Sequence, residues 1–292
     1  MCDQDTQKDV DEYLRRHPEM TRRDFTKFAT VAGLAMMLPP VANAQSVTET
    51  DVEITTPDGV ADCYFVHPAN GSHAAVLVWP DILGLRPGFR EMGKRLARSG
   101  YSVLVVNPFY RSAHAPVVSL GASFGQPEVR NHVMPMARAL NADTHFTDAR
   151  AFQGWLDQQD AVDTSRGIGT TGYCMGGPMV MRTVAAVPDR FKAGGTFHGG
   201  GLATGEANSP HLLIPDTTAS MLHCVAENDD ASDPDAKNTL REAYGAANLS
   251  AEIEVYTDTL HGWCAIDSTV YHQEQAERAW GRLLALFETA LA

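Results

Sequence analysis

From about Val52 onward, short β-rich runs alternate with longer helical patterns, and this alternation constrains the fold more than any other feature. It predicts an α/β fold with a mainly parallel sheet flanked by helices. The expected strands are residues 52–55, 61–66, 74–79, 102–106, 167–171, 193–197, 221–226 and 252–256. The first two should form an antiparallel pair around a Pro-Asp-Gly turn. Helices are expected at 88–99, ending at Gly100, and at 274–291.

No internal repeat, linker or low-complexity stretch occurs after residue 45, so residues 45–292 are expected to form a single domain. The stretch 111–141 is long for a simple connection, and only a short helix around 128–140 is predicted within it. Insertions of this kind after a strand commonly cover a site. The alternative is a surface excursion without a role.

Residues 1–44 are predicted to be an export signal rather than part of the fold. An arginine pair at 22–23 precedes an uncharged run over 28–41, which is too short to span a bilayer, and a small-x-small triplet at 42–44 follows. This order resembles a twin-arginine signal and predicts a periplasmic or secreted protein. A buried or amphipathic helix is the alternative. A long acidic segment, residues 1–19, precedes the arginine pair, so it stays open whether the protein starts at Met1 or at Met20.

The charge of the chain limits its partners. The formal net charge is −13 and no basic run is present, which argues against nucleic acid and anionic membrane as partners. A small-molecule substrate is expected, with membrane contact only during export. The cysteines beyond the signal are expected to be mostly free and buried, although their disulfide state stays open: Cys63, Cys174, Cys224 and Cys264.

One six-residue segment, Gly-Tyr-Cys-Met-Gly-Gly at 172–177, follows an expected strand and precedes a helical pattern that runs to about Val187. The order of strand, sharp turn, nucleophile and helix is that of a nucleophile elbow, with Cys174 at its centre. The glycines two residues before and after remove side chains that would clash in the strained turn. The helix amino terminus would favour a thiolate and offer N–H groups to an oxyanion. A buried cysteine in a glycine-rich turn is the alternative.

A nucleophilic cysteine needs a base and an acid that orients the base. In a fold with this elbow, the acid and the histidine follow the nucleophile on loops after later strands. Asp229 follows the strand 221–226, with Asp230 as the near alternative. His261 follows the strand 252–256 and is the expected base.

Other histidines give weaker signals. The His-Gly-Gly-Gly run at 198–201 resembles an oxyanion motif but comes after the nucleophile, so it predicts a tight turn with His198 near the wall of the site. His223 lies within a strand, and His261-x-x-Cys264 lacks further ligands at metal spacing, so no metal is predicted. No glycine-rich nucleotide motif accompanies the first strands, and no cofactor is predicted.

Four segments together resemble the dienelactone hydrolase family, the cysteine branch of the α/β-hydrolase fold: Trp-Pro-Asp-Ile-Leu-Gly-Leu at 79–85, Gly-Tyr-Cys-Met-Gly-Gly, Glu-Asn-Asp at 227–229 and His-Gly-Trp at 261–263. The resemblance spans about 52–291. It implies a triad of Cys174, Asp229 and His261, with the oxyanion held by the backbone N–H groups of Ile82 and Met175.

Two positions depart from the founding enzyme of that family. Asp81 stands where that enzyme has a glutamate that helps convert thiol into thiolate, so Asp81 is expected to modulate the thiol with a shorter side chain. Capping of the following turn is the alternative role for Asp81. Ala265 stands where the founding enzyme has an arginine that binds a substrate carboxylate, so the substrate does not carry over.

The residues and the resemblance together predict an exported α/β-hydrolase that opens a lactone or cleaves a small carboxylic ester through a cysteinyl acyl-enzyme. A thioesterase or acyltransferase on the same triad is one alternative. The other is a ligand-binding protein on a hydrolase fold that has lost turnover.

Overall fold

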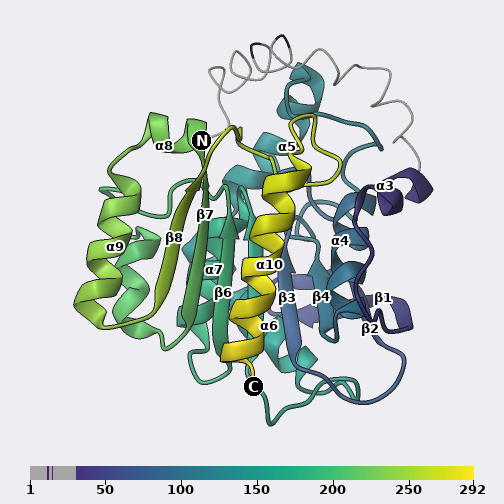
Figure 1. Ribbon diagram of the computed structural model, residues 1–292. Coiled ribbons are helices and arrows are strands. Elements are labelled where there is room, and N and C mark those ends of the chain that lie inside the picture. The colour runs from purple at the N-terminus through teal and green to yellow at the C-terminus, as the bar shows by residue number, and fades with distance from the viewer. Residues whose placement is uncertain (1–11, 13–14, 16–30) are drawn as a thin grey trace.

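The computed structural model describes residues 12, 15 and 31–292, and its centre is an eight-stranded sheet (Figure 1). The strands are β1 (Val47–Thr56), β2 (Gly59–Pro68), β3 (Ala75–Trp79), β4 (Ser102–Val106), β5 (Ile168–Tyr173), β6 (Phe191–Phe197), β7 (Ser220–Ala226) and β8 (Ala251–Tyr256). Their order in the sheet is β1-β2-β4-β3-β5-β6-β7-β8. Strand β2 is antiparallel to β1 and β4, and every other neighbouring pair is parallel. The predicted α/β fold is confirmed.

The expected hairpin is present but longer than predicted. Each of its two strands has ten residues, because the antiparallel ladder continues from the turn to the pair Val47 and Pro68. Polar and charged residues fill much of β1, which forms the exposed edge of the sheet. The hydrophobic pattern alone therefore predicts only the part of β1 next to the turn and the centre of β2.

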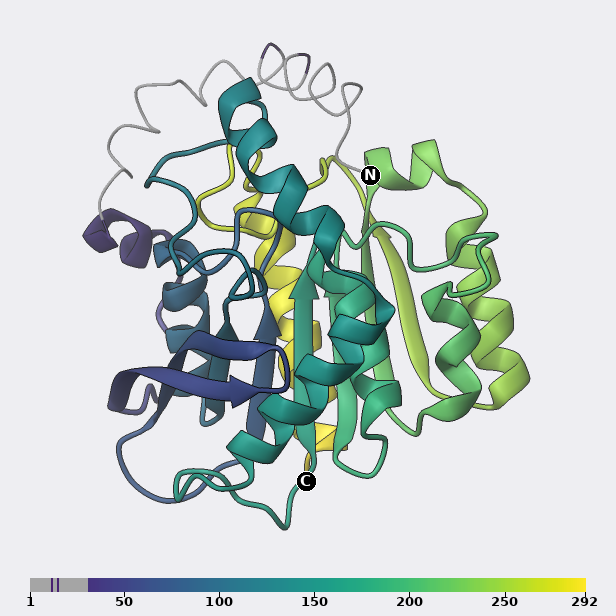
Figure 2. The ribbon, with the colours of Figure 1, turned by 180° about the vertical axis from the view of Figure 1, so that it is seen from behind.

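Helices cover both faces of the sheet (Figures 1 and 2). Helices α4 (Pro87–Arg98) and α10 (Gln273–Ala290) pack on one face, and α6 (Ala142–Leu156), α7 (Gly176–Ala186) and α9 (Ala236–Ala247) pack on the other. Successive residues of β3 point to opposite faces, so Val76 joins the core under α4 and α10 while Leu77 joins the core under α6 and α7. All five residues of β3 are buried for this reason.

Helix α4 begins and ends at the predicted signals. Pro87 lies in its first turn. A backbone N–H in that turn has no acceptor within the helix, so proline, which lacks the N–H, loses no helical hydrogen bond there. At the other end Gly100 adopts a φ of 99° and its N–H donates to the Ala97 carbonyl at 3.0 Å. This left-handed residue ends the helix, as expected for a glycine at that position.

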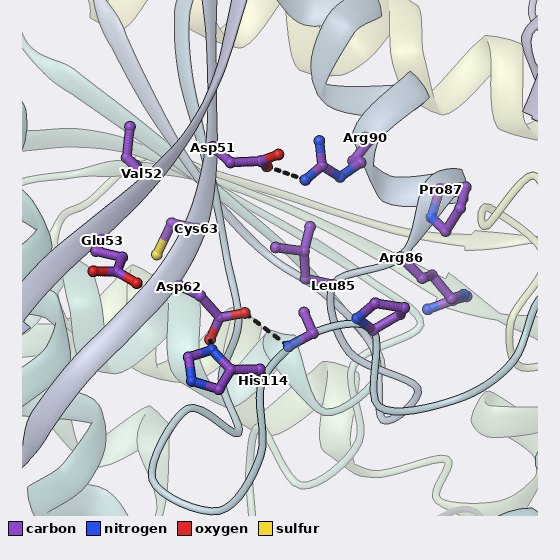
Figure 3. A pocket seen from close by; sticks show the side chains of 12 residues that line it. Asp51, Val52, Glu53, Asp62, Cys63, Leu85, Arg86, Pro87, Arg90 and His114 are labelled. Carbon is purple, nitrogen blue, oxygen red and sulfur yellow. Dashed lines mark hydrogen bonds and ion pairs between the residues drawn. The ribbon is translucent and has the colours of Figure 1, made fainter.

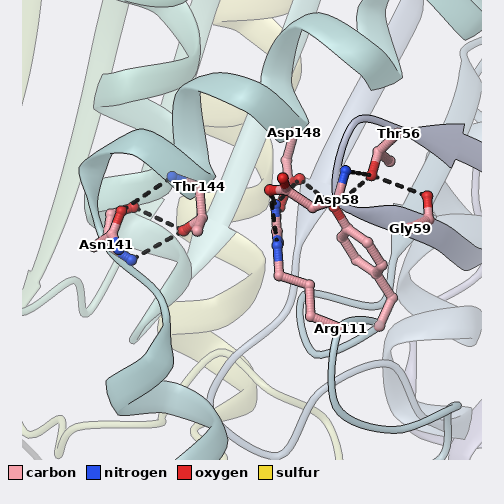
Figure 4. A network of polar contacts seen from close by, with 8 residues as sticks. Thr56, Asp58, Gly59, Arg111, Asn141, Thr144 and Asp148 are labelled. Atoms are coloured by element: carbon pink, nitrogen blue, oxygen red, sulfur yellow. Dashed lines mark hydrogen bonds and ion pairs between the residues drawn. The ribbon is translucent and has the colours of Figure 1, made fainter.

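The insertion between β4 and α6 contains one further helix, α5 (Pro127–Ala139), as predicted. Both ends of the insertion are anchored (Figure 4). At its start the Arg111 guanidinium donates to the carboxylates of Asp58 and Asp148. At its end Asn141 and Thr144 form a reciprocal capping box that begins α6. Arg111 therefore ties the start of the insertion to the β1–β2 turn and to α6, and the capping box defines where α6 begins.

The predicted export signal lies mostly outside the described residues, including its arginine pair. Its apolar run contributes α3 (Val31–Met37), whose Leu34 is 1% exposed and belongs to the core cluster that includes α4 residues. The triplet 42–44 is exposed and free of helix or strand. Within the described part of the chain, no helix has both the length and the apolar character needed to cross a bilayer.

Candidate active site

Cys174 lies at the carboxyl end of β5, in the sharp turn that leads into α7. Its φ of 52° is in the left-handed region, which a non-glycine residue adopts only under strain. A Cβ atom added to Gly172 would lie 2.3 Å from the Gly176 carbonyl oxygen, and one added to Gly176 would lie 2.4 Å from the Trp79 carbonyl oxygen. Both glycines are therefore required by close backbone contacts, and the turn has the geometry predicted for an elbow.

Asp229 is the predicted acid that faces the histidine. Its two carboxylate oxygens lie 2.9 Å and 3.0 Å from Nδ1 of His261. Asp230 points elsewhere and accepts a hydrogen bond from Lys237 Nζ at 2.6 Å. The expectation that the acid lies on a loop is wrong, because Asp229 lies in the first turn of a short helix, α8 (Glu227–Ser232).

His261 connects the acid to the nucleophile. Its backbone N–H donates to Asn228 Oδ1 at 2.9 Å, which fixes the start of the loop, and its side chain makes a hydrogen bond with that of Cys174. Burial alone would lower the pKa of His261. The negative charge of Cys174 and the hydrogen bond to Asp229 outweigh burial and raise that pKa to about 10. The imidazole of His261 is therefore held in its protonated form.

The other three described cysteines differ from Cys174. Cys63, Cys224 and Cys264 are free and buried, as predicted. Burial raises the pKa of each of these thiols above its ordinary value. None of the three is therefore disposed to form a thiolate.

The two predicted oxyanion donors come from the loop after β3 and from the residue that follows Cys174. The carbonyl of Trp79, just before the loop that carries Ile82, contacts Gly176 at the start of α7. Ile82 and Met175 pack in the same apolar cluster. Among the described residues, neither backbone N–H has a hydrogen-bond acceptor, so both are available to a ligand.

Asp81 is 9% exposed and its carboxylate is bound on two sides. The Leu83 N–H donates to Oδ1 at 2.9 Å, which is the bond that the capping interpretation expects. Arg86 donates to Oδ1 at 2.6 Å and to Oδ2 at 2.9 Å. This arginine was not anticipated, and its charge offsets that of Asp81.

His198 also lies at the site, at the end of β6, with a left-handed φ of 42°. Its ring centre is 5.1 Å from that of His261, in an edge-to-face arrangement. It is fully buried, and among the described residues neither ring nitrogen has a hydrogen-bonding partner. Burial, with a smaller contribution from the charge of His261, lowers the pKa of His198 to about 3, so this ring is neutral. Its position near the wall of the site agrees with the sequence analysis.

The surroundings of the elbow are apolar on one side. Ile82 and Met175 pack with Phe109 and with Val133 and Met136 of α5, so the insertion does border the site. Ala265, which stands where the founding enzyme of the resembled family has an arginine, is 1% exposed. Within the described residues no cluster of three or more His, Cys, Asp or Glu side chains could hold a metal ion.

A cavity of about 520 Å³ lies beside these loops, between β1, β2 and the start of α4 (Figure 3). Its lining includes Arg86, Asp62 and His114, but it includes neither Cys174 nor His261. The cavity therefore does not contain the groups of the candidate active site.

Comparison with known proteins decides the family, because the model of the Dienelactone hydrolase family matches residues 61–291. The chain belongs to the dienelactone hydrolase family. Membership makes it a carboxylic-ester hydrolase by class. A predicted carboxymethylenebutenolidase of Methylorubrum extorquens is 25% identical over 92% of this chain and 93% of that protein. The carboxymethylenebutenolidase of Rhodococcus opacus is 24% identical over 76% and 83% of the two chains.

A solved structure shares the fold. A predicted dienelactone hydrolase of Klebsiella pneumoniae superposes with a TM-score of 0.72 at 24% identity, covering 84% of this chain and all (100%) of that chain. The eight-stranded sheet with its flanking helices is therefore the α/β-hydrolase fold that the resemblance implied.

Proposed function

We propose that this family member hydrolyses carboxylic esters or lactones through a cysteinyl acyl-enzyme, with Cys174, His261 and Asp229 as the triad. The observation that supports it most directly is His261, which bonds Asp229 through one ring nitrogen and contacts Cys174 with its side chain. A nucleophile, a base and an acid that orients the base thus lie together at the strained turn that carries Cys174.

The reaction follows from these contacts. The Cys174 thiolate attacks the ester carbonyl, and the N–H groups of Ile82 and Met175 hold the resulting oxyanion. As the tetrahedral intermediate collapses, the C–O bond breaks and protonated His261 gives its proton to the leaving alkoxide. Neutral His261 then removes a proton from water, which attacks the thioester, and the C–S bond breaks to release the carboxylic acid and restore the ion pair. Asp229 orients the ring throughout.

A panel of esters and lactones tests the proposal. Uncharged substrates with apolar acyl groups should turn over best, because apolar residues border the elbow and Ala265 offers no cation. Esters with a free carboxylate on the acyl chain should react more slowly. The Cys174→Ala variant is the control, and a panel with no turnover beyond this control would contradict a hydrolase. Thioesters and alternative acyl acceptors distinguish a thioesterase or acyltransferase, and a fluorophosphonate-type probe that fails to label the protein would favour a non-catalytic binder.

Cys174 is expected to be the first thiol to react with iodoacetamide. It contacts a protonated His261, whereas burial raises the pKa of Cys63, Cys224 and Cys264. Because the pKa of His261 is raised to about 10, the imidazolium persists from mildly acidic pH until pH rises through that value, and labelling should be efficient over this whole range. Peptide mapping after partial labelling identifies the site. Faster labelling of another cysteine with activity retained would contradict the triad.

The thiol-modulating role proposed for Asp81 is tested with Asp81→Asn. If Asp81 suppresses the thiolate of the empty enzyme, the variant should alkylate faster at Cys174 and hydrolyse esters more slowly. If Asp81 holds the turn instead, the alkylation rate should stay unchanged while the melting temperature falls. The contacts with Leu83 and Arg86 favour the capping outcome.

We also propose that residues 1–44 direct export through the twin-arginine route and are removed afterwards. A variant with lysine at both Arg22 and Arg23 should accumulate in the cytoplasm. Mass spectrometry of the periplasmic wild-type protein should show a chain that begins at Gln45. A periplasmic chain that keeps residues 31–44 would contradict cleavage and would leave Leu34 in its buried place.

A further inference from the structure

Arg86 uses every donor of its guanidinium within the protein. Nη1 donates to Asp81 at 2.6 Å and to the Gly84 carbonyl at 3.2 Å. Nη2 donates to Asp81 at 2.9 Å and to Asp267 at 2.8 Å, and Nε donates to Asp267 at 2.8 Å. An arginine has five N–H groups, so none is left for a substrate. The side chain is 7% exposed, and such a pair of bidentate contacts is geometrically specific.

Arg86 thus forms a bridge between Asp81 and Asp267. The Asp81 end of this bridge holds the loop that carries Ile82. The Asp81 carboxylate also accepts from the Leu83 N–H, and the Gly84 N–H donates to the Asp81 carbonyl at 2.9 Å. With the Arg86 contact to the Gly84 carbonyl, these bonds close a tight turn around Ile82. The turn has little freedom left, and the Ile82 N–H stays available to a ligand.

The other end holds the loop that carries His261. Asp267 lies six positions further along that loop, which is folded by turns such as Trp263 N–H to the Leu260 carbonyl at 3.0 Å and Ser268 N–H to the Ala265 carbonyl at 2.9 Å. Arg86 and Asp267 are 181 residues apart in the sequence. The bridge is therefore a direct connection between the loop of the oxyanion donor and the loop of the base.

We propose that Arg86 is a positioning residue that, through Asp81 and Asp267, holds the Ile82 N–H in register with His261 and Cys174. This inference rests on the proposed function, since it assumes that Ile82 stabilises an oxyanion. Loss of the bridge releases the Ile82 loop. Steps that need the oxyanion donor should then slow, while steps that need only the thiolate should not.

The Arg86→Met variant tests the bridge, with p-nitrophenyl acetate as substrate for acylation and iodoacetamide as a probe that needs no oxyanion hole. The acylation burst rate and kcat should fall by about 100-fold, the loss typical of one missing oxyanion donor. KM and the iodoacetamide rate should change by less than about threefold, because neither depends on the Ile82 N–H. Arg86→Lys should recover only part of the loss, since an ammonium cannot span both carboxylates.

Arg95→Met is the matched control. Arg95 lies on helix α4, which Arg86 directly precedes, and makes a bidentate contact with Glu277 at 2.6 Å and 2.5 Å, away from the Ile82 loop. This variant should lower the melting temperature and leave acylation within about threefold of the wild type. If Arg86→Met does not fold, Asp267→Asn replaces it, because the amide retains one acceptor oxygen and removes the charge. Its acylation should fall by about tenfold.

Several outcomes overturn the inference. It fails if Arg86→Met, or Asp267→Asn in its place, acylates at the wild-type rate. It also fails if acylation falls only as much as in Arg95→Met, or if alkylation falls in parallel with acylation. A wild-type protein with no ester turnover beyond the Cys174→Ala control would instead contradict the proposed function, so the two failures are distinguishable.

Discussion

Replacing His261 with alanine is expected to lower kcat/KM by about 10³-fold or more, and replacing Cys174 with alanine should remove ester hydrolysis altogether. In the proposed mechanism His261 carries out both proton transfers, and its pKa is raised to about 10 in the site. Without it the thiol loses its base and the leaving group loses its acid. Steady-state kinetics on the best ester of the panel measure both losses.

Variants of Asp229 and Asp230 provide an internal control for this prediction. Asp229→Asn should cost less than His261→Ala, because the amide still occupies the place beside Nδ1 but no longer stabilises the imidazolium. Asp230→Asn should leave the rate within about threefold, since its partner is Lys237 and not the histidine. Equal losses at the two aspartates would contradict the assignment of Asp229 as the acid. Hydrolysis that survives in Cys174→Ala would show that another nucleophile acts.

Alanine at Gly172 or Gly176 should have the largest effect on stability. The added Cβ would lie 2.3 Å from the Gly176 oxygen in the first case and 2.4 Å from the Trp79 oxygen in the second. Both neighbours are backbone atoms of buried elements, so neither can move aside cheaply. The free energy of unfolding should fall by about 3 kcal/mol or more in each variant, measured by denaturant unfolding.

Gly154→Ala is the matched control for these variants. Gly154 lies within helix α6, and a Cβ added there meets no atom within 4 Å. Alanine should therefore raise stability by about 0.5–1 kcal/mol, the usual gain for this change in a helix. Stability losses of the same size at all three glycines would mean that the close contacts at the elbow do not set the requirement for glycine.

The strand and helix pattern was predictable because it depends on local properties of the chain. The uninterrupted apolar runs of β3 and β4 reflect burial on both faces, and Gly100 marks the end of α4 through its own backbone preference. The hairpin was underestimated because an edge strand carries polar residues that hide its length. Helix α8 was missed because its six residues, Glu-Asn-Asp-Asp-Ala-Ser, have no apolar period.

The sequence by itself determined the fold class and the elbow, because alternation of element types and the glycine spacing around Cys174 are short-range patterns with short-range causes. Only the tertiary structure decided which aspartate faces His261, since one turn of α8 directs Asp229 and Asp230 to different partners. Only the tertiary structure revealed the Arg86 bridge and the contact of His198 with His261. These contacts join segments far apart in the chain, and their geometry is set by how the sheet brings the carboxyl ends of its strands together.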